Sequence, residues 1–442
     1  TVSGALTQPG DITIDVATGK TLTYTGAAVT LGAKVLTLSG GGTLSNTNAF
    51  VLNDANSKLL LNSITLGSAS TSADSLGIDV DANSTVTSLS VANITSLSIA
   101  SGKSLSGAVT VTAGSLKLNE TGTLASTIAM SGGTLDADET SIVSGALTQS
   151  GDIALDVADN KTLTYSGAAV SLGANTLTLS GGGTLGNTNA FVLNNANSKL
   201  LLNSITLDSA STSSDSLGLD IDTNSTVTSL SVSHITPVSI AAGKSLSGAV
   251  TVTAGSLKLN ETGTLASTIA MSGGTLDADE SSTVSGALSH TADIEIDVAT
   301  SKTLTYSGAA ISLGANTITL SGGGSLVSGG LTLNDADSKL LLNSITLDSA
   351  STSADSLGLD VDNNSTITAL SVGHITPVSI AAGKSLSGAV TVTAGSLKLN
   401  ETGTLASTIA MSGGTLDADE TSIVSGTLTQ SGDIAIDIAT GK

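Results

Sequence analysis

The sequence predicts an all-β fold, a right-handed parallel β-solenoid with about twenty residues per coil. Three observations lead to this prediction. Apolar residues alternate with small polar ones in short runs, which is the pattern of β-strands whose side chains point to opposite faces in turn. No window has the i, i+3, i+4 apolar spacing of an amphipathic helix. The same phrases also return at a long and nearly constant period.

The repeat is clearest in the stretch Lys103–Glu139, which returns unchanged at Lys244–Glu280 and again at Lys384–Glu420. No change of composition separates the copies, so we expect one continuous solenoid over 1–442 rather than separable domains. The chain divides into three repeats and a partial fourth, at 1–141, 142–282, 283–422 and 423–442.

Within a repeat, short strands follow one another with Gly, Asn, Asp or Ser between them. Leu105, Leu124 and Val143 recur at a constant interval of nineteen, which suggests about seven coils per repeat. In the first repeat we expect strand segments within 12–16, 22–24, 29–31, 35–38, 50–52, 59–66, 78–80, 86–99, 109–111, 116–118 and 142–147.

The third repeat is one residue shorter, because Val327–Gly330 replaces Asn187–Phe191. A deletion inside a strand would exchange the inward and outward faces downstream. The apolar pattern after Leu331 is unchanged, so we predict that a corner absorbs the deletion.

The core must be aliphatic, since 39% of the residues are hydrophobic but only 1% are aromatic. The alternative fold is a string of antiparallel sandwiches, which usually carry an aromatic core residue and Asn-Gly or Asp-Gly hairpin turns. The chain has neither, and the solenoid is preferred. In the repeated stretch we expect six side chains to point inward: Leu105, Val109, Val111, Leu116, Leu118 and Leu124.

Composition also limits the partners. All fourteen basic residues are lysines, and 36 acids give a net charge of −22, which argues against binding to nucleic acid and to anionic lipid surfaces. The chain has no cysteine, and no apolar run approaches the length of a membrane span, so we expect neither disulfides nor membrane insertion.

The phrases GKTLTYTGAAVTLGAKVLTLSGGGTL (19–44) and AGSLKLNETGTL (113–124) carry a family likeness. They resemble the Gly-Gly-Thr-Leu strand repeats of autotransporter passengers and filamentous haemagglutinin-like adhesins. Those families are extracellular bacterial right-handed β-helices that serve as fibres, stalks and adhesins. The resemblance implies a location outside the cell or on its surface. It lies in the scaffold and carries over no functional residue.

Two acidic patterns are the candidate binding sites. Oxygen ligands two residues apart resemble the opening of a calcium loop, although the Gly and distal Glu of an EF-hand are absent. The simpler interpretation is a solvated outer face, so calcium is the alternative and the only cofactor that the pattern suggests. The candidates are Asp79, Asp81 and Asn83, with copies Asp220, Asp222 and Asn224 and Asp360, Asp362 and Asn364, together with Asp136, Asp138 and Glu139, which recur at 277–280 and 417–420.

Asparagines that end strands, such as Asn53, Asn62 and Asn119, form a further group. Some lie in glycosylation sequons, but we expect them to adopt left-handed corners and to stack their amides between coils. His234 and His374 replace Asn93, and each is isolated in the sequence, so we expect surface imidazoles.

We therefore expect no enzyme and no catalytic residue, because arginine is absent, aromatic platforms are nearly absent and every acidic cluster is repeated. The preferred function is a structural section of an extracellular filament, stalk or surface-layer fibre. The alternative is an adhesin that binds cells or surface glycans. Neither end of the chain resembles a cap, which predicts end-to-end association with copies of itself or adjoining repeats.

Overall fold

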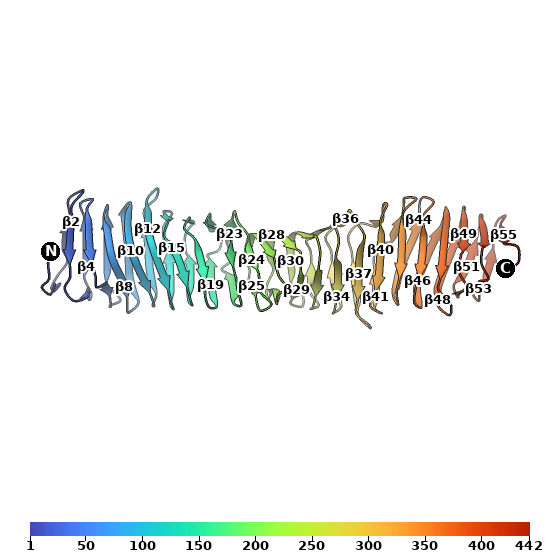
Figure 1. Ribbon diagram of the computed structural model, residues 1–442, viewed down its shortest axis with the longest axis horizontal. Helices are drawn as coiled ribbons and strands as arrows, with labels where there is room; N and C mark the ends of the chain where they lie inside the picture. The colour runs from blue at the N-terminus through green and yellow to red at the C-terminus, as the bar shows by residue number, and fades with distance from the viewer. The chain divides into compact units, whose positions relative to one another are not determined.

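The computed structural model describes all residues from 1 to 442 as strands and turns, with no helix. The chain forms two compact units, Thr1–Thr228 and Ser229–Lys442. Each unit is a parallel β-solenoid in which strands of successive coils lie side by side (Figure 1). The predicted all-β solenoid is confirmed.

One strand of every coil enters a ladder that we call sheet B, and within each unit these strands pair in parallel with those of the neighbouring coils. In the first unit these strands are β1 (Ile12–Asp15), β4 (Val35–Ser39), β7 (Lys58–Asn62), β9 (Ser75–Ala82), β11 (Thr95–Ile99), β13 (Ser115–Leu118), β16 (Thr134–Ala137), β19 (Ile153–Val157), β22 (Thr176–Ser180), β25 (Lys199–Leu202) and β27 (Gly218–Ile221). In the second unit they are β29 (Ile235–Ile240), β31 (Ser256–Leu259), β34 (Thr275–Ala278), β37 (Ile294–Val298), β40 (Thr317–Ser321), β43 (Lys339–Leu342), β45 (Gly358–Val361), β47 (Ile375–Ile380), β49 (Ser396–Leu399), β52 (Thr415–Ala418) and β55 (Ala435–Ile438).

The rest of each coil contributes to a second ladder, sheet A, either as one long strand or as two short ones. In the first repeat and the start of the second these are β2 (Thr21–Tyr24), β3 (Val29–Thr30), β5 (Thr43–Asn46), β6 (Phe50–Leu52), β8 (Thr65–Thr71), β10 (Ser84–Val91), β12 (Ser104–Val111), β14 (Thr123–Leu124), β15 (Thr127–Met130), β17 (Ser141–Val143) and β18 (Leu147–Gln149). The same order recurs along the chain.

Each repeat contains seven coils, as the sequence predicted, but the coils differ in length. The coil that runs from Ile12 to its partner Leu36 is longer than the coil that runs from Leu59 to its partner Ile78. A period of about twenty residues per coil is therefore an average. Corners take up the extra residues, because the paired strands stay in register on either side of them.

The core lies between the two sheets and is built from aliphatic columns. The six side chains expected to point inward are all buried, with exposed fractions of 2% or less. Leu116 pairs with Leu135, which pairs with Leu155, so equal positions of successive coils stack on one another. Burying a leucine side chain contributes about 1.5–3 kcal/mol, so these columns are the main stabilising element.

Some corners require glycine. Gly107 has φ of 117°, and a Cβ atom there would lie 1.9 Å from the carbonyl oxygen of Val86 in the preceding coil. The register between β10 and β12 shifts just after the Val86–Gly107 pair, at a bulge. A side chain at Gly107 would therefore force the two coils apart.

The shortened corner of the third repeat behaves as predicted. In the first repeat, Asn46 is 7% exposed, and its amide donates to the carbonyl oxygen of Ser68 over 2.7 Å. In the third repeat, Ser328 takes over this corner and donates its backbone N–H to Asp348 over 2.9 Å. Gly330 turns the chain with φ of 104°.

Downstream of that corner the inward face is preserved. Leu340 and Leu342 are fully buried, as are their counterparts Leu200 and Leu202. The deletion is therefore confined to one corner.

The expectation that the strand-ending asparagines adopt left-handed corners is wrong. The non-glycine residues with positive φ are four serines and Asn160, and none is among the asparagines proposed for this role. Asn53 instead accepts a hydrogen bond from the backbone N–H of Gly32 over 2.8 Å. Its copies Asn194 and Asn334 do the same for Gly173 and Gly314, over 2.8 Å and 2.9 Å. One amide-to-amide contact between coils occurs at a copy of Asn62, where Asn363 donates to Asn343 over 2.5 Å.

Replacing Leu116 with Asp tests the core assignment. The change would bury a carboxylate in a fully enclosed aliphatic column, and we expect a loss of more than about 3 kcal/mol in the free energy of unfolding. Urea denaturation measures it. Thr110→Asp, which adds the same charge at an exposed position of β12, is the control and should change little. Equal stability of the two variants would contradict the core assignment.

Candidate cation sites

The first acidic pattern lies on the outer face of sheet B, and its leading carboxylates are paired with lysines. Asp79 follows Lys58 by one coil, and its carboxylate lies 2.7 Å from the Lys58 ammonium group. The copies of this pair repeat the contact. Lys199 reaches Asp220 over 2.6 Å, and Lys339 reaches Asp360 over 2.8 Å.

The other members of this pattern point elsewhere. Asp81, Asp222 and Asp362 are exposed at the ends of their strands. The side-chain oxygen of Asn83 accepts hydrogen bonds from the backbone N–H of Ser104 at 3.0 Å and from its hydroxyl at 3.3 Å. Asn364 does the same for Ser385, and Asn224 occupies the corresponding position of the second repeat. The amide oxygen is thus directed at the next coil.

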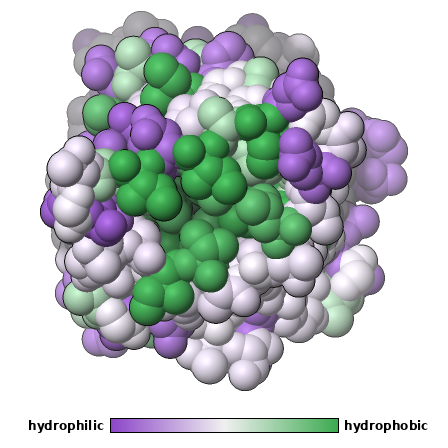
Figure 2. All heavy atoms as spheres, turned by 90° about the vertical axis from the view of Figure 1, so that its right-hand side faces the viewer, coloured by the Kyte–Doolittle hydropathy of each residue, from purple (hydrophilic) through white to green (hydrophobic).

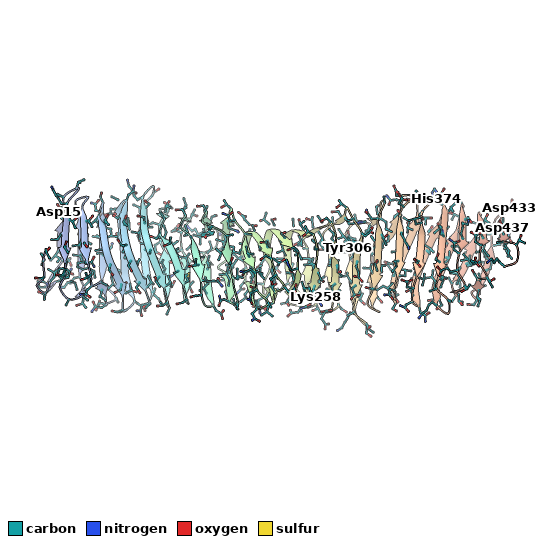
Figure 3. The ribbon with its side chains drawn as sticks, viewed as in Figure 1. Asp15, Lys258, Tyr306, His374, Asp433 and Asp437 are labelled. Carbon is teal, nitrogen blue, oxygen red and sulfur yellow. The ribbon has the colours of Figure 1, made fainter.

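The second acidic pattern converges on one lysine. The ammonium group of Lys117 lies 2.8 Å from Asp136 and 3.0 Å from Asp138. Glu139 turns away and pairs with Lys161 of the next coil over 2.6 Å. In the second unit Lys258, which lies at the surface (Figure 3), holds Asp277 and Asp279 at 3.0 Å each.

The remaining copies follow the same scheme. Glu280 pairs with Lys302 over 2.6 Å, and Glu420 pairs with Lys442. Lys398 lies 3.4 Å from Asp417 and 3.2 Å from Asp419.

The surroundings of Asp136 disfavour its charged form. Burial raises the pKa of its carboxyl and outweighs the hydrogen bond from Lys117, which lowers it, while Asp138 and Asp156 raise it further. One of its oxygens, Oδ1, has no hydrogen-bond partner. The pKa of Lys117 is raised by its bonds to the two aspartates. The contact therefore favours the charged form of Lys117, whereas burial disfavours the charged form of Asp136 in spite of it.

The second unit repeats this arrangement at Asp277. Its pKa is raised by burial and by Asp279 and Asp297, against the lowering effect of Lys258. Its Oδ1 also lacks a partner. The first two repeats thus share this environment at their buried aspartates.

The histidines lie apart from these clusters. His374 approaches Asp355 at 3.9 Å, and the Nδ1 atom of His234 lies 2.9 Å from the hydroxyl of Ser233. The ring of His290 lies between two backbone carbonyl groups, those of Ala292 and Ser312. No group of three or more acidic, histidine or cysteine side chains is arranged to hold a metal ion.

Sequence reasoning missed the lysine partners of the acidic clusters. The signal was present, because Lys58 and Asp79, like Lys117 and Asp136, are separated by close to one coil of sequence. The coil length varies from place to place, so only the observed register identifies which lysine faces which carboxylate.

No known protein family, curated protein or solved structure matches this chain. The structure contains no helix long and apolar enough to cross a lipid bilayer. The fold and the repeated surface pairs define a class: this is a β-solenoid repeat protein with acidic outer faces, part of whose carboxylates are paired to lysines between coils.

Calcium binding can be tested by thermal unfolding. Because lysines already neutralise Asp79, Asp136 and Glu139, we expect calcium and a chelator to give the same melting midpoint. A midpoint several degrees higher in calcium would instead identify a cation site. Two substitutions would then locate the site. Asp136→Asn should remove the rise if the second cluster binds calcium, and Asp79→Asn should remove it if the first cluster does.

The raised pKa values of Asp136 and Asp277 predict a pH dependence. An acid whose folded-state pKa is raised stabilises the fold fully below its ordinary value of 3.8, and that contribution is lost as the pH rises through the raised pKa. Lowering the pH from neutral toward about 4 should therefore raise the melting midpoint, because each carboxyl binds its proton more readily in the folded state.

The matched variants separate this effect from general charge repulsion. Asp136→Asn with Asp277→Asn should reduce the pH-dependent rise, since neither position can then ionise. Asp81→Asn with Asp222→Asn removes the same number of charges from exposed positions. This double variant should keep more of the pH-dependent rise in the melting midpoint. An equal reduction in both double variants would contradict the assignment.

Proposed function

We propose that this chain is a structural section of an extracellular filament, stalk or surface-layer fibre of the autotransporter-passenger and haemagglutinin-like type, without catalytic activity. In this role, coils of adjoining repeats or of a second copy cover the end faces of the solenoid. The regular coils, the aliphatic columns and the repeated ion pairs support a function of length and durability.

The observation that carries the proposal is a difference in burial: one position is exposed in the last coil and buried in the earlier repeats. Ile436 of β55 is 57% exposed, but its counterparts Leu155 and Ile296 are each 1% exposed. In the first unit the cover for Leu155 is Leu179 of β22, the next coil. The same inward side chain is thus buried in the two repeats where a coil lies on each side of it.

The face at the C-terminal end is apolar at its centre and ringed by polar groups (Figure 2). Its exposed apolar residues are Ile423, Val424, Leu428, Ile436 and Ile438. Asp433 and Asp437 lie at the same end (Figure 3). At the other end an apolar hollow of about 200 Å³ is lined by Val2, Leu6, Ile14, Leu22, Tyr24, Leu44 and Phe50. Two apolar faces of this kind are suited to coil-on-coil stacking.

The proposal predicts that the 442-residue chain associates end to end. Sedimentation velocity should show a series of oligomers, and electron microscopy should show particles that lengthen with concentration. Ile436→Asp with Ile438→Asp places charges on one end face and should abolish the series, whereas Thr110→Asp with Thr251→Asp on outer faces should not. A monomer of 42.8 kDa at every concentration would contradict it.

An adhesin is the second candidate, and one feature favours it. A polar hollow of about 210 Å³ lies over Ser63, Thr65, Asn83, Thr85 and Ser106, among other small residues. Its hydroxyl and amide groups match the hydrogen-bonding groups of a neutral glycan. Specific binding of the isolated chain to a glycan array would put adhesion first.

A further inference from the structure

One segment of twenty residues occurs four times along the chain, at 1–20, 142–161, 283–302 and 423–442, and we number these segments from first to fourth. The fourth segment is identical to the first at fifteen of its twenty positions. Each of the first three segments is followed by a similar coil, which in the first repeat comprises residues 21–52. We call this coil the receiving coil. The four segments therefore show one piece of sequence with and without a receiving coil beside it.

The receiving coil is what buries the inward face of the segment. Val16 of the first segment packs on this coil alone, and it is only 5% exposed. Its counterparts Val157 and Val298 have coils on both sides and are fully buried. Ile438 of the fourth segment also packs on one coil, but on the preceding one, and it is 62% exposed. The open face of the fourth segment is therefore the face that a receiving coil covers in the other three.

Hydrogen bonds fix how the segment sits on the receiving coil. The carboxylate of Asp11 accepts from the backbone N–H of Val35 over 2.9 Å, and that of Asp15 accepts from the hydroxyl of Ser39 over 2.7 Å. The second and third segments repeat both bonds with the coils that follow them. The same contacts thus occur three times, and they belong to the segment and its receiving coil.

The fourth segment keeps the groups that make these contacts. Asp433 and Asp437 occupy the positions of the two aspartates, and both are exposed at the C-terminal end (Figure 3). Leu428 occupies the position of Leu6, whose backbone N–H donates to the hydroxyl of Tyr24 in the receiving coil over 3.2 Å. The second and third segments repeat this bond as well. The fourth segment is therefore equipped to bind a receiving coil.

Two chains can join at this face in two ways. In the first, the fourth segment of one chain stacks on the first segment of the next. Nearly identical segments in register then place Asp437 beside Asp15 and Lys442 beside Lys20, and like charges directly opposite one another are destabilising. In the second, the fourth segment replaces the first on the receiving coil and meets the N–H and hydroxyl donors that the first segment uses. The charges therefore favour replacement.

We propose that the fourth segment of one chain displaces the first segment of a second chain and takes its place on the receiving coil. This segment exchange rests on the proposed end-to-end assembly and states how the joint is made. In the joint, Asp433 accepts from the N–H of Val35, and Ile436 pairs with Leu38 as Ile14 does within one chain. The second and third segments show this pairing with their own receiving coils.

The order that each segment already has favours the exchange. The fourth segment is held by the pairing of β55 with β52, so it needs no further ordering to bind. The first segment contacts the receiving coil alone, and its Ile12 and Ile14 are only half-buried, whereas their counterparts Ile153 and Leu155 are 4% and 1% exposed. Displacement replaces its contacts with equivalent ones and returns conformational freedom to the released residues.

Charge at the joint is nearly balanced, although the net charge of −22 on each chain opposes association at a distance. The fourth segment carries two aspartates and one lysine, and Lys34 is the one charged residue of the receiving coil. At about 0.15 M salt, charges farther apart than about 8 Å are largely screened. The measurements are therefore made at that ionic strength.

Disulfide trapping distinguishes exchange from stacking, because the chain has no cysteine. Full-length chains with Asp437→Cys are mixed under a mild oxidant with chains that carry either Ser39→Cys or Asp15→Cys. Exchange places position 437 beside position 39 at the spacing of paired strands, about 4.8 Å, which a disulfide can span. We expect the 437–39 disulfide to form at least about tenfold faster than the 437–15 disulfide, as measured by mass spectrometry of the linked peptides. The opposite preference would overturn the exchange and leave end-to-end association in place.

Weakening the first segment gives a second test, in which the two joints predict opposite changes. Ile12→Ser with Ile14→Ser loosens the hold of the first segment on the receiving coil. Under exchange this opens the coil to the fourth segment, so the association constant from sedimentation equilibrium should rise by at least about tenfold. Under stacking the same change removes apolar contacts from the joint and should lower it. Thr13→Ser, at an exposed position of the same strand, is the matched control and should change nothing.

The outcomes separate this proposal from the proposed function. If the parent chain associates but the association constant of the Ile12→Ser, Ile14→Ser variant falls or stays the same, with an unchanged circular dichroism spectrum, the exchange is wrong and the end-to-end assembly remains. A parent chain that stays monomeric and forms neither disulfide would overturn both.

Discussion

The stacking of equal positions in successive coils is the constraint on which the rest of this structure depends. Parallel pairing in register places Leu116 under Leu135 and Leu135 under Leu155, so each coil completes the core of the coil before it. A single coil has no interior of its own, because its inward side chains need a neighbour on each side. The hydrogen bonds between coils and the aliphatic columns therefore form together or not at all.

The same register organises the surface. Once the columns fix one coil over the next, outward residues about one coil apart also meet, as Lys58 meets Asp79 and Lys161 meets Glu139. These pairs are exposed enough that each contributes roughly 0–1 kcal/mol. Their larger effect is to neutralise part of an outer face that carries many carboxylates. The surface pattern is thus a consequence of the core pattern.

The sequence was sufficient for the fold class, the coil number and the inward residues, because alternation and repetition are properties of the chain itself. The six inward residues between Leu105 and Leu124 could be assigned to the core from the alternation of apolar and polar residues alone. Partners across coils could not be assigned, since they depend on corner lengths that range from coil to coil. The exposed Leu76 was missed for a related reason. It precedes Gly77, where a bulge interrupts the alternation that would otherwise identify its face.

The shortened corner near Ser328 has a consequence for how such a chain can change over time. A missing residue there alters one turn and its hydrogen bonds to Asp348, and Leu340 is already back in its column. Because each coil contacts only its immediate neighbours, the loss of one residue alters only the corner in which it lies. Repeats of this kind can gain, lose or exchange residues at their corners, while the alternation of inward and outward side chains in the strands is preserved.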